Sequence, residues 1–379
     1  MNLICFCHLR WNFVYQRPQH LLSRFAKDFS VYFIEEPIFD SSSPVIETQI
    51  TSEGISVIVP HLPPGLDETA ISQLQIDLLQ QWQNAIGIGE HIQWFYTPMA
   101  LPLANAFNKP RLIVYDCMDE LSAFKNAPSA LREREQELFS NADIVFTGGH
   151  NLYEAKKKLH HNIHPFPSSI DKQHFSKARS AVSEPEEQAK ISGPKIGFFG
   201  VIDERLDISL LDSLAFINPH WQFVLIGPVV KIDPATLPQR SNIHYLGGKS
   251  YEDLPLYLSG WDVALIPFAA NESTQFISPT KTPEYLAGGI PVVSTSIRDV
   301  VRPYGEEKLV YIGDTAEEFT AGIQWGLERK TDKVWLAKVD DFLKDNSWDN
   351  TQFKMVQELK ALLPSSPLKP ITEKEKIYV

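Results

Sequence analysis

The stretch Ile196-Gly197-Phe198-Phe199-Gly200 decides the fold, because a second series of strands and helices begins with it. It is a short apolar run that ends in glycine. Further apolar runs follow at 223–226, 243–246, 263–266, 291–294 and 309–312, and segments of helical period lie near 207–216, 254–259, 282–287 and 316–327. Such alternation is typical of a parallel sheet with crossover helices. The second half of the chain is therefore predicted to be one doubly wound unit.

The first half shows the same alternation. Apolar runs lie at 3–7, 31–34, 55–59, 92–96, 112–115 and 144–147, with helices expected after Pro18 and near 68–86, 128–139 and 151–159. Residues 176–192 are polar and lack apolar periodicity, which favours a linker. We expect an N-terminal domain at 1–175, this linker, a C-terminal domain at 193–345, a helix at 346–363 that packs back towards the N-terminal domain, and a tail at 364–379. The predicted fold class is α/β, with two doubly wound Rossmann-like domains that face each other across a cleft.

Composition narrows the classes of function. The formal net charge of −12 argues against a nucleic-acid partner, although one Arg or Lys in a cleft can still bind a phosphate. The cysteines, Cys5, Cys7 and Cys117, show no metal-ligand spacing and suit a reducing compartment. The first residues indicate a strand rather than a signal peptide, and no apolar run reaches the length of a membrane span. We therefore expect a cytoplasmic protein.

Ligands of open α/β sheets bind at the carboxyl ends of the strands. One such place is Ser278-Pro279-Thr280-Lys281-Thr282-Pro283-Glu284-Tyr285-Leu286-Ala287-Gly288-Gly289-Ile290-Pro291-Val292-Val293-Ser294. It predicts a loop, a short helix, a glycine stop and a buried strand. Free amides and Lys281 at the start of that helix suit a phosphate, and the Glu284 carboxylate suits vicinal ribose hydroxyls. The alternative is a helix whose glutamate only complements the helix dipole.

This segment resembles the nucleotide-sugar site of GT-B glycosyltransferases, especially glycosyltransferase family 4 and its relatives. The resemblance implies that Glu284 binds the donor ribose, and that Lys281 and the amides around Thr280 lie near the diphosphate. The family pattern has a second glutamate eight positions earlier. In this sequence that position is Phe276, and Glu272 is the nearest acid.

A second similarity lies at 196–207. The glycine at the end of this strand, Gly200, lets the backbone approach a pyrophosphate closely. In the family, basic residues soon after this glycine hold the donor diphosphate. By that resemblance Arg205 is the candidate here, with no lysine at the usual spacing. A surface arginine on a loop is the alternative.

The N-terminal half offers candidates for the acceptor side. The aromatic and polar loop at 11–20 follows the first strand, and it resembles the first loop of a bacterial subgroup of these transferases linked to polysaccharide or teichuronic acid assembly. We expect Arg17 and His20 to face the acceptor. At the end of another strand, Asp116 or Asp119 could accept a proton from an acceptor hydroxyl, with helix capping by Asp119 as the alternative. The turn at 147–150 is expected to line the cleft.

The leading hypothesis is a glycosyltransferase of hexosyltransferase type that uses a nucleoside-diphosphate sugar as donor substrate and no cofactor. The acceptor is a saccharide or a lipid-linked molecule in polysaccharide synthesis. We expect no metal, because no Asp-x-Asp motif follows a strand. Basic residues around Lys156 could give peripheral contact with a membrane, or form a solvated helix face. The alternatives are a nucleotide-sugar epimerase of the same architecture and a non-catalytic nucleotide-sugar-binding protein.

Overall fold

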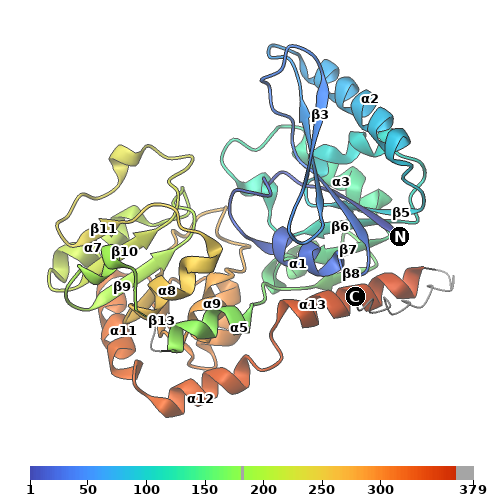
Figure 1. Ribbon diagram of the computed structural model, residues 1–379. Helices are drawn as coiled ribbons and strands as arrows, with labels where there is room; N and C mark the ends of the chain where they lie inside the picture. The colour runs from blue at the N-terminus through green and yellow to red at the C-terminus, as the bar shows by residue number, and fades with distance from the viewer. Residues whose placement is uncertain (181–182, 364–379) are drawn as a thin grey trace, which may run out of the picture.

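The computed structural model describes residues 1–180 and 183–363, which form two α/β lobes side by side (Figure 1). The N-terminal lobe holds a sheet in the order β3-β4-β2-β1-β5-β6-β7-β8. Its strands are β1 (Asn2–Phe6), β2 (Ser30–Ile34), β3 (Val45–Ile50), β4 (Ser56–His61), β5 (His91–Phe95), β6 (Leu112–Cys117), β7 (Ile144–Thr147) and β8 (Ile163–Pro165). Strand β3 runs antiparallel to β4, whereas the pairs from β4 to β8 are parallel.

The C-terminal lobe holds a parallel sheet in the order β11-β10-β9-β12-β13-β14. Its strands are β9 (Lys195–Phe199), β10 (Gln222–Ile226), β11 (Ile243–Tyr245), β12 (Val263–Ile266), β13 (Val292–Ser294) and β14 (Val310–Ile312). This is the Rossmann order, which reverses between β9 and β12 and favours a ligand site at the carboxyl ends of those strands. The corresponding reversal in the other lobe lies between β1 and β5. The predicted α/β fold with two doubly wound units is confirmed.

Helices cover both faces of each sheet. In the N-terminal lobe these are α1 (Arg17–Phe25), α2 (Glu68–Ile86), η1 (Pro98–Ala106), η2 (Leu121–Ala123), α3 (Leu131–Asn141) and α4 (His150–Lys156). The C-terminal lobe carries α7 (Ile208–Ile217), η4 (Pro234–Thr236), η5 (Tyr251–Asp253), α8 (Leu254–Ser259), α9 (Lys281–Ala287), α10 (Arg298–Val300), η6 (Val301–Gly305), α11 (Ala316–Arg329) and α12 (Lys333–Phe342). Each lobe therefore buries its own hydrophobic core.

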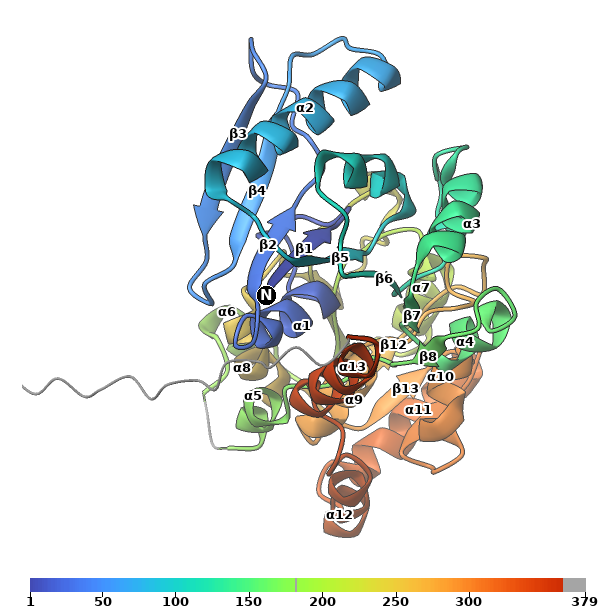
Figure 2. The ribbon, with the colours of Figure 1, turned by 90° about the vertical axis from the view of Figure 1, so that its right-hand side faces the viewer.

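The last helix ties the two lobes together. After α12 the chain returns to the N-terminal lobe, where α13 (Trp348–Leu362) lies against α1 (Figure 1, Figure 2). Trp348, Met355 and Leu359 are buried in the core of that lobe. The ring of Trp348 stacks on His20, with centroids 4.7 Å apart. The C-terminal helix thus completes the N-terminal core.

The segment expected to link the domains packs on the C-terminal lobe. It contains η3 (Ser176–Arg179) and α6 (Glu186–Ala189), and follows α5 (Lys172–Phe175). Gln188 is fully buried, donates a hydrogen bond to the Tyr257 carbonyl and accepts one from the Trp261 indole. A buried indole N–H needs such a partner, which explains why this polar segment is held in place.

Sequence patterns missed β3, β8 and α12. Strand β3 is mostly exposed, so it lacks the apolar alternation of a half-buried strand. The predicted tail at 364–379 lies outside the described residues. Within the described part of the chain, no helix is long and apolar enough to cross a membrane.

Candidate functional site

A cavity of about 790 Å³ lies between the lobes, at the carboxyl ends of strands β9, β10 and β11 of the C-terminal sheet. Its size falls in the range of small-molecule sites. The N-terminal wall is made of residues from two loops, 11–16 and 49–53, together with Val57. The C-terminal wall includes Phe199, Gly200, Val201, Arg205, Gly227, Gly248, Tyr251, Thr280, Lys281 and Glu284. We call this cavity the interlobe cleft.

The turn after β9 brings the backbone close to a lysine side chain. Gly200 has φ of +138°, a conformation that L side chains rarely adopt. A Cβ at this position would also overlap the Lys281 side chain, which lies directly above it. The Lys281 Nζ lies 5.8 Å from the ring centroids of both Phe198 and Phe268. Residue 200 must therefore be glycine for the Lys281 ammonium to reach this part of the cleft.

Lys281, which is partly buried, and Glu284, which is buried, are oppositely charged residues of the C-terminal wall. Burial, followed by the nearby Arg205, lowers the pKa of Lys281 to about 8. Burial raises the pKa of Glu284 to about 7, against the opposing effect of Lys281. Among residues 1–180 and 183–363, none donates a hydrogen bond to the Glu284 carboxylate. A buried carboxylate that lines a cavity without a donor is suited to accept one from a ligand.

Arg205 lies on the loop after β9, where Asp203 fixes it. The guanidinium donates to both carboxylate oxygens of Asp203, at 2.9 Å from Nε to Oδ1 and 2.6 Å from Nη2 to Oδ2. It also lies over the Phe124 ring of the opposite lobe, 5.9 Å from the centroid. Because Asp203 already orders the guanidinium group, the Arg205 side chain loses less conformational freedom when it binds a ligand. Arg205 is therefore pre-oriented at the interlobe cleft.

Asp119 faces this arginine from the N-terminal lobe. Burial raises the pKa of Asp119 to about 6, while Arg205 and Arg17 oppose that shift. After Arg205 and Arg17, the third cation that acts on Asp119 is Lys231. It lies on the loop after β10, with its Nζ 5.2 Å from the centroid of the Phe124 ring. A carboxyl group with a pKa near neutrality can exchange protons during a reaction.

Sequence reasoning missed two residues beside Asp119. Burial and then Lys231 lower the pKa of His8 to about 4, so its ring is neutral near pH 7. The Nδ1 atom of His8 has no hydrogen-bond partner within the described part of the chain. His8 could have been found, because it follows β1 at the strand edge where ligand-binding residues gather. No sequence signal distinguished Lys231.

Arg17 and Asp116 do not face the cleft but bind each other. Arg17 donates to Asp116 at 2.8 Å from Nη2 and 3.1 Å from Nε, and to the Phe166 carbonyl at 2.6 Å. Both side chains are buried. Burial raises the pKa of Asp116, and Arg17 opposes that shift. The expectation of Arg17 as an acceptor ligand and Asp116 as a base is corrected, because this pair joins α1 to β6.

His20 is also buried, and the expectation that it binds the acceptor is corrected. Its ring lies between Trp348 and Tyr15, and Tyr251 contacts its edge at 5.3 Å. Burial lowers the pKa of His20 well below its usual value. Tyr15 in turn stacks on Tyr251, with centroids 4.6 Å apart, which is a direct contact between the lobes.

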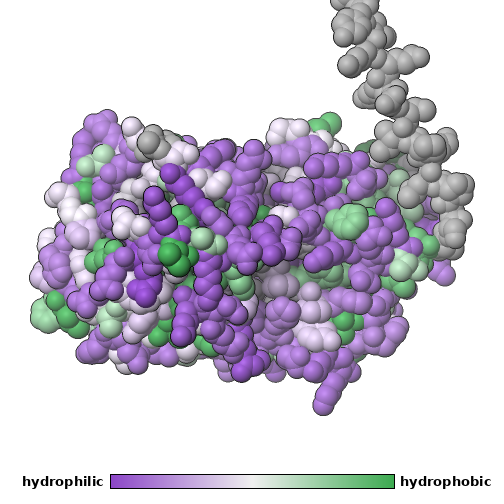
Figure 3. All heavy atoms as spheres, turned by 90° about the horizontal axis from the view of Figure 1, so that it is seen from below, coloured by the Kyte–Doolittle hydropathy of each residue, from purple (hydrophilic) through white to green (hydrophobic). Residues whose placement is uncertain are grey.

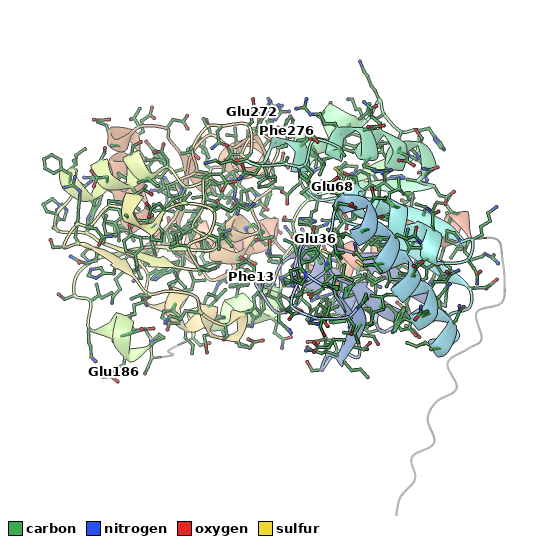
Figure 4. All side chains as sticks on the ribbon, turned by 90° about the horizontal axis from the view of Figure 1, so that it is seen from above. Phe13, Glu36, Glu68, Glu186, Glu272 and Phe276 are labelled. Atoms are coloured by element: carbon green, nitrogen blue, oxygen red, sulfur yellow. The ribbon has the colours of Figure 1, made fainter. Side chains whose placement is uncertain are left out.

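The loop before α9 differs from the family pattern in space as well as in sequence. Thr280 precedes α9 and lines the cleft, but its side chain makes no capping hydrogen bond. Phe276 packs against the N-terminal core. Glu272 is exposed and lines a different cavity, and Figure 4 shows both residues well away from Phe13. Glu272 therefore does not replace the acid that is missing at 276.

Two further expectations are corrected. Lys156 is buried between Glu120 and Glu135, with distances of 2.7 and 2.8 Å, so it does not belong to an exposed basic face. The view from below shows a mostly hydrophilic surface with scattered hydrophobic side chains (Figure 3).

The turn at 147–150 contacts the other lobe rather than the cleft, because Asp299 accepts hydrogen bonds from the amides of His150 and Asn151.

Comparisons with known proteins agree with this architecture. Residues 193–329 match the family described as "Glycosyl transferases group 1". A curated relative from Bacillus subtilis (strain 168), "Putative teichuronic acid biosynthesis glycosyltransferase TuaH", is 24% identical over 300 residues, which cover 74% of this chain and 75% of the relative. The resemblance to GT-B glycosyltransferases and the prediction of glycosyl transfer are confirmed at this level.

Solved structures share the fold over nearly the whole chain. One is described as "Trehalose-6-phosphate from E. coli bound with UDP-2-fluoro glucose", with a TM-score of 0.67, 11% identity and coverage of 95% of this chain and 99% of that one. Sucrose-phosphate synthase from Thermosynechococcus elongatus has a TM-score of 0.67 at 14% identity, with coverage of 96% and 99%. The catalytic domain of starch synthase IV from Arabidopsis thaliana, bound to ADP and acarbose, has a TM-score of 0.68 at 10% identity, with coverage of 96% and 99%.

The Arg17–Asp116 pair predicts a change in stability without a change in donor binding. Arg17→Met leaves Asp116 buried without its counter-charge and is expected to cost about 3–5 kcal/mol in the free energy of unfolding. The double variant Arg17→Met/Asp116→Leu should recover most of this loss. Denaturant unfolding measures the first effect, and calorimetric titration with nucleotides measures the second. Loss of nucleotide affinity in the well-folded double variant would return these residues to the site.

Proposed function

We propose that this chain transfers a hexosyl group from a nucleoside-diphosphate sugar to a saccharide or lipid-linked acceptor in polysaccharide synthesis. The observation that carries the proposal is the placement of a partly buried lysine, Lys281, and a buried carboxylate, Glu284, on one wall of a cleft between two Rossmann-like lobes. The family match supports glycosyl transfer, and the name of the relative from B. subtilis supports a polymer of the cell surface. The UDP-2-fluoro glucose and ADP bound by two structural neighbours support a nucleotide donor.

The C-terminal wall is proposed to bind the donor. Glu284 accepts hydrogen bonds from the ribose hydroxyls, and Lys281 neutralises the diphosphate. Arg205 approaches the same phosphates from the loop after β9, and Gly200 leaves room for them. Since charge accumulates on the diphosphate as the sugar leaves, cations fixed beforehand stabilise the transition state more than the ground state. With this charge supplied by side chains, we propose that transfer requires no divalent metal and no cofactor.

The N-terminal lobe is proposed to hold the acceptor and its base. With Asp116 paired to Arg17, Asp119 is the carboxylate that remains for the acceptor proton. It lies opposite Arg205, so closure of the lobes brings an acceptor hydroxyl near the donor phosphates. The stacked contacts of Tyr15 with Tyr251 and of Trp348 with His20 hold the two walls in this orientation.

Replacing Glu284 tests donor binding directly. Glu284→Ala removes two hydrogen bonds to a charged acceptor and is expected to raise the Kd of the nucleotide sugar by at least about 100-fold. Calorimetry with UDP-, GDP-, ADP- and dTDP-sugars identifies the donor and measures this change. The matched control is Glu272→Ala, an exposed acid outside the cleft, which should bind as the unmodified protein does. Equal affinities for the two variants would contradict the proposal.

Donor affinity is also expected to depend on pH in both directions. Glu284 must be ionised to accept the ribose hydroxyls, so affinity should fall as the pH drops through its pKa of about 7. Lys281 must be protonated to attract the diphosphate, so affinity should fall as the pH rises through its pKa of about 8. Calorimetric Kd values from about pH 5.5 to about pH 9 check the shape. Glu284→Gln should lose the acid limb alone, and a flat profile for the unmodified protein would contradict this assignment.

Asp119 is expected to affect turnover and not donor binding. Asp119→Asn should reduce acceptor-dependent release of nucleoside diphosphate by about 10²–10⁴-fold, because the base is lost, while the donor Kd stays unchanged. The exposed Glu133→Gln on α3 is the control for a change of charge on the same lobe. Activity of the unmodified protein should persist in EDTA. Full activity of Asp119→Asn, or loss of activity in EDTA, would contradict these roles.

A further inference from the structure

The loop after β1 exposes one aromatic side chain and packs the two other aromatic side chains of the loop against further rings. Trp11 is 8% exposed and packs edge-on against Phe33, and Tyr15 stacks on Tyr251. Phe13, between them, is 51% exposed and lines the interlobe cleft. Figure 4 shows Phe13 at the boundary between the lobes. An apolar ring kept exposed at a cavity wall, when both aromatic neighbours pack on other rings, indicates a contact with a ligand.

The loop is held too firmly for this exposure to result from disorder. The Glu35 carboxylate accepts a hydrogen bond from the Trp11 amide at 2.7 Å. The Gln19 side chain donates to the Trp11 and Val14 carbonyls at 2.9 and 3.2 Å and accepts from the Gln16 amide at 3.0 Å. The ring of Phe13 is thus presented on a fixed backbone, which lowers the entropy lost on binding.

The tip of the β3–β4 hairpin completes this wall. Ile50, which is 77% exposed, lies on the same cavity with Gln49, Thr51, Ser52 and Glu53. A sugar ring has an apolar C–H face and a rim of hydroxyl groups. The side chains of Phe13 and Ile50 suit the C–H face. The amide of Gln49 and the hydroxyl groups of Thr51 and Ser52 suit the hydroxyl groups of the sugar.

The two walls differ in their basic residues. The C-terminal wall carries Arg205, Lys249 and Lys281 beside two acids, Glu252 and Glu284, whereas the N-terminal lining residues among the described ones include no Lys or Arg and one acid, Glu53. On α1, Arg17 is paired with Asp116 and Arg24 with Asp349. A ligand carboxylate or phosphate on this wall would lack a counter-charge and would face Glu53.

We propose that Phe13 and the hairpin tip at 49–53 form the acceptor subsite, and that it binds an uncharged terminal sugar whose C–H face stacks on Phe13. This inference rests on the proposed function, since it assigns the second substrate of the same cleft. It replaces the expected pair Arg17 and His20 with the residues of the same loop that reach the cavity.

Glycan capture tests the class of acceptor. Oligosaccharides that end in glucose, galactose or an N-acetylhexosamine are immobilised beside matched ones that end in a uronic acid. The protein is applied with the nucleoside diphosphate selected by calorimetry. Neutral ends should be captured and uronic ends should not. Phe13→Ala should weaken capture about tenfold, and Phe13→Trp should retain it. The control, Phe39→Ala, alters an exposed ring of the same lobe on another cavity and should have no effect.

Reversing the charge of Glu53 gives a result that a purely structural role of this residue would not produce. Glu53→Lys places a cation on the wall and should increase capture of uronic ends, because their carboxylate gains a partner. Preference of the unmodified protein for uronic ends, no capture of any neutral end, or equal capture by Phe13→Ala would overturn the inference. If Glu284→Ala still abolishes donor binding in that case, the proposed function stands and only the acceptor assignment fails. Unchanged donor binding in Glu284→Ala would instead remove the proposed function.

Discussion

The close approach of Lys281 to the backbone at Gly200 is the constraint on which the site depends. The loops after β9 and β10 meet there, and a Cβ at Gly227 would overlap the carbonyl of Gly200. Two glycines in unusual conformations thus clear the space at the reversal of the sheet. The Lys281 ammonium group fills part of this space, and the Glu284 carboxylate lies one helical turn further along α9. Without those glycines, Lys281 and Glu284 could not share one face of the cleft.

The sequence predicted this wall well because its signal is local. A glycine at the end of a strand, a lysine at the start of a helix and a glutamate three residues later all lie within short segments, so Gly200, Lys281 and Glu284 could be placed without knowledge of tertiary contacts. The two sheets were predictable for the same reason, since buried parallel strands are continuous apolar runs. Strand β3 was missed because it is a polar, exposed edge.

For the N-terminal wall, the sequence predicted a loop that lines the cleft but not which of its residues reach the cavity. Arg17 is removed from the cleft by Asp116, a partner 99 positions away, and His20 by Trp348, which belongs to the last helix. Neither pairing has a local signature. The sequence shows that an aromatic loop follows β1, whereas only the fold shows that Trp11 is buried and Tyr15 stacks on Tyr251 while Phe13 is exposed. A side chain whose residue type suggests a functional role can thus serve instead to hold two secondary-structure elements together.

The division of charge between the walls follows from what each substrate does. A diphosphate gains charge as the bond to the sugar breaks, so cations fixed on the donor wall stabilise the moment of transfer. A cation on the acceptor wall would attract the same diphosphate and oppose placement of a neutral hydroxyl beside it. In the proposed function, the diphosphate of the donor binds at Lys281 and Arg205, and its sugar faces the wall that carries Phe13.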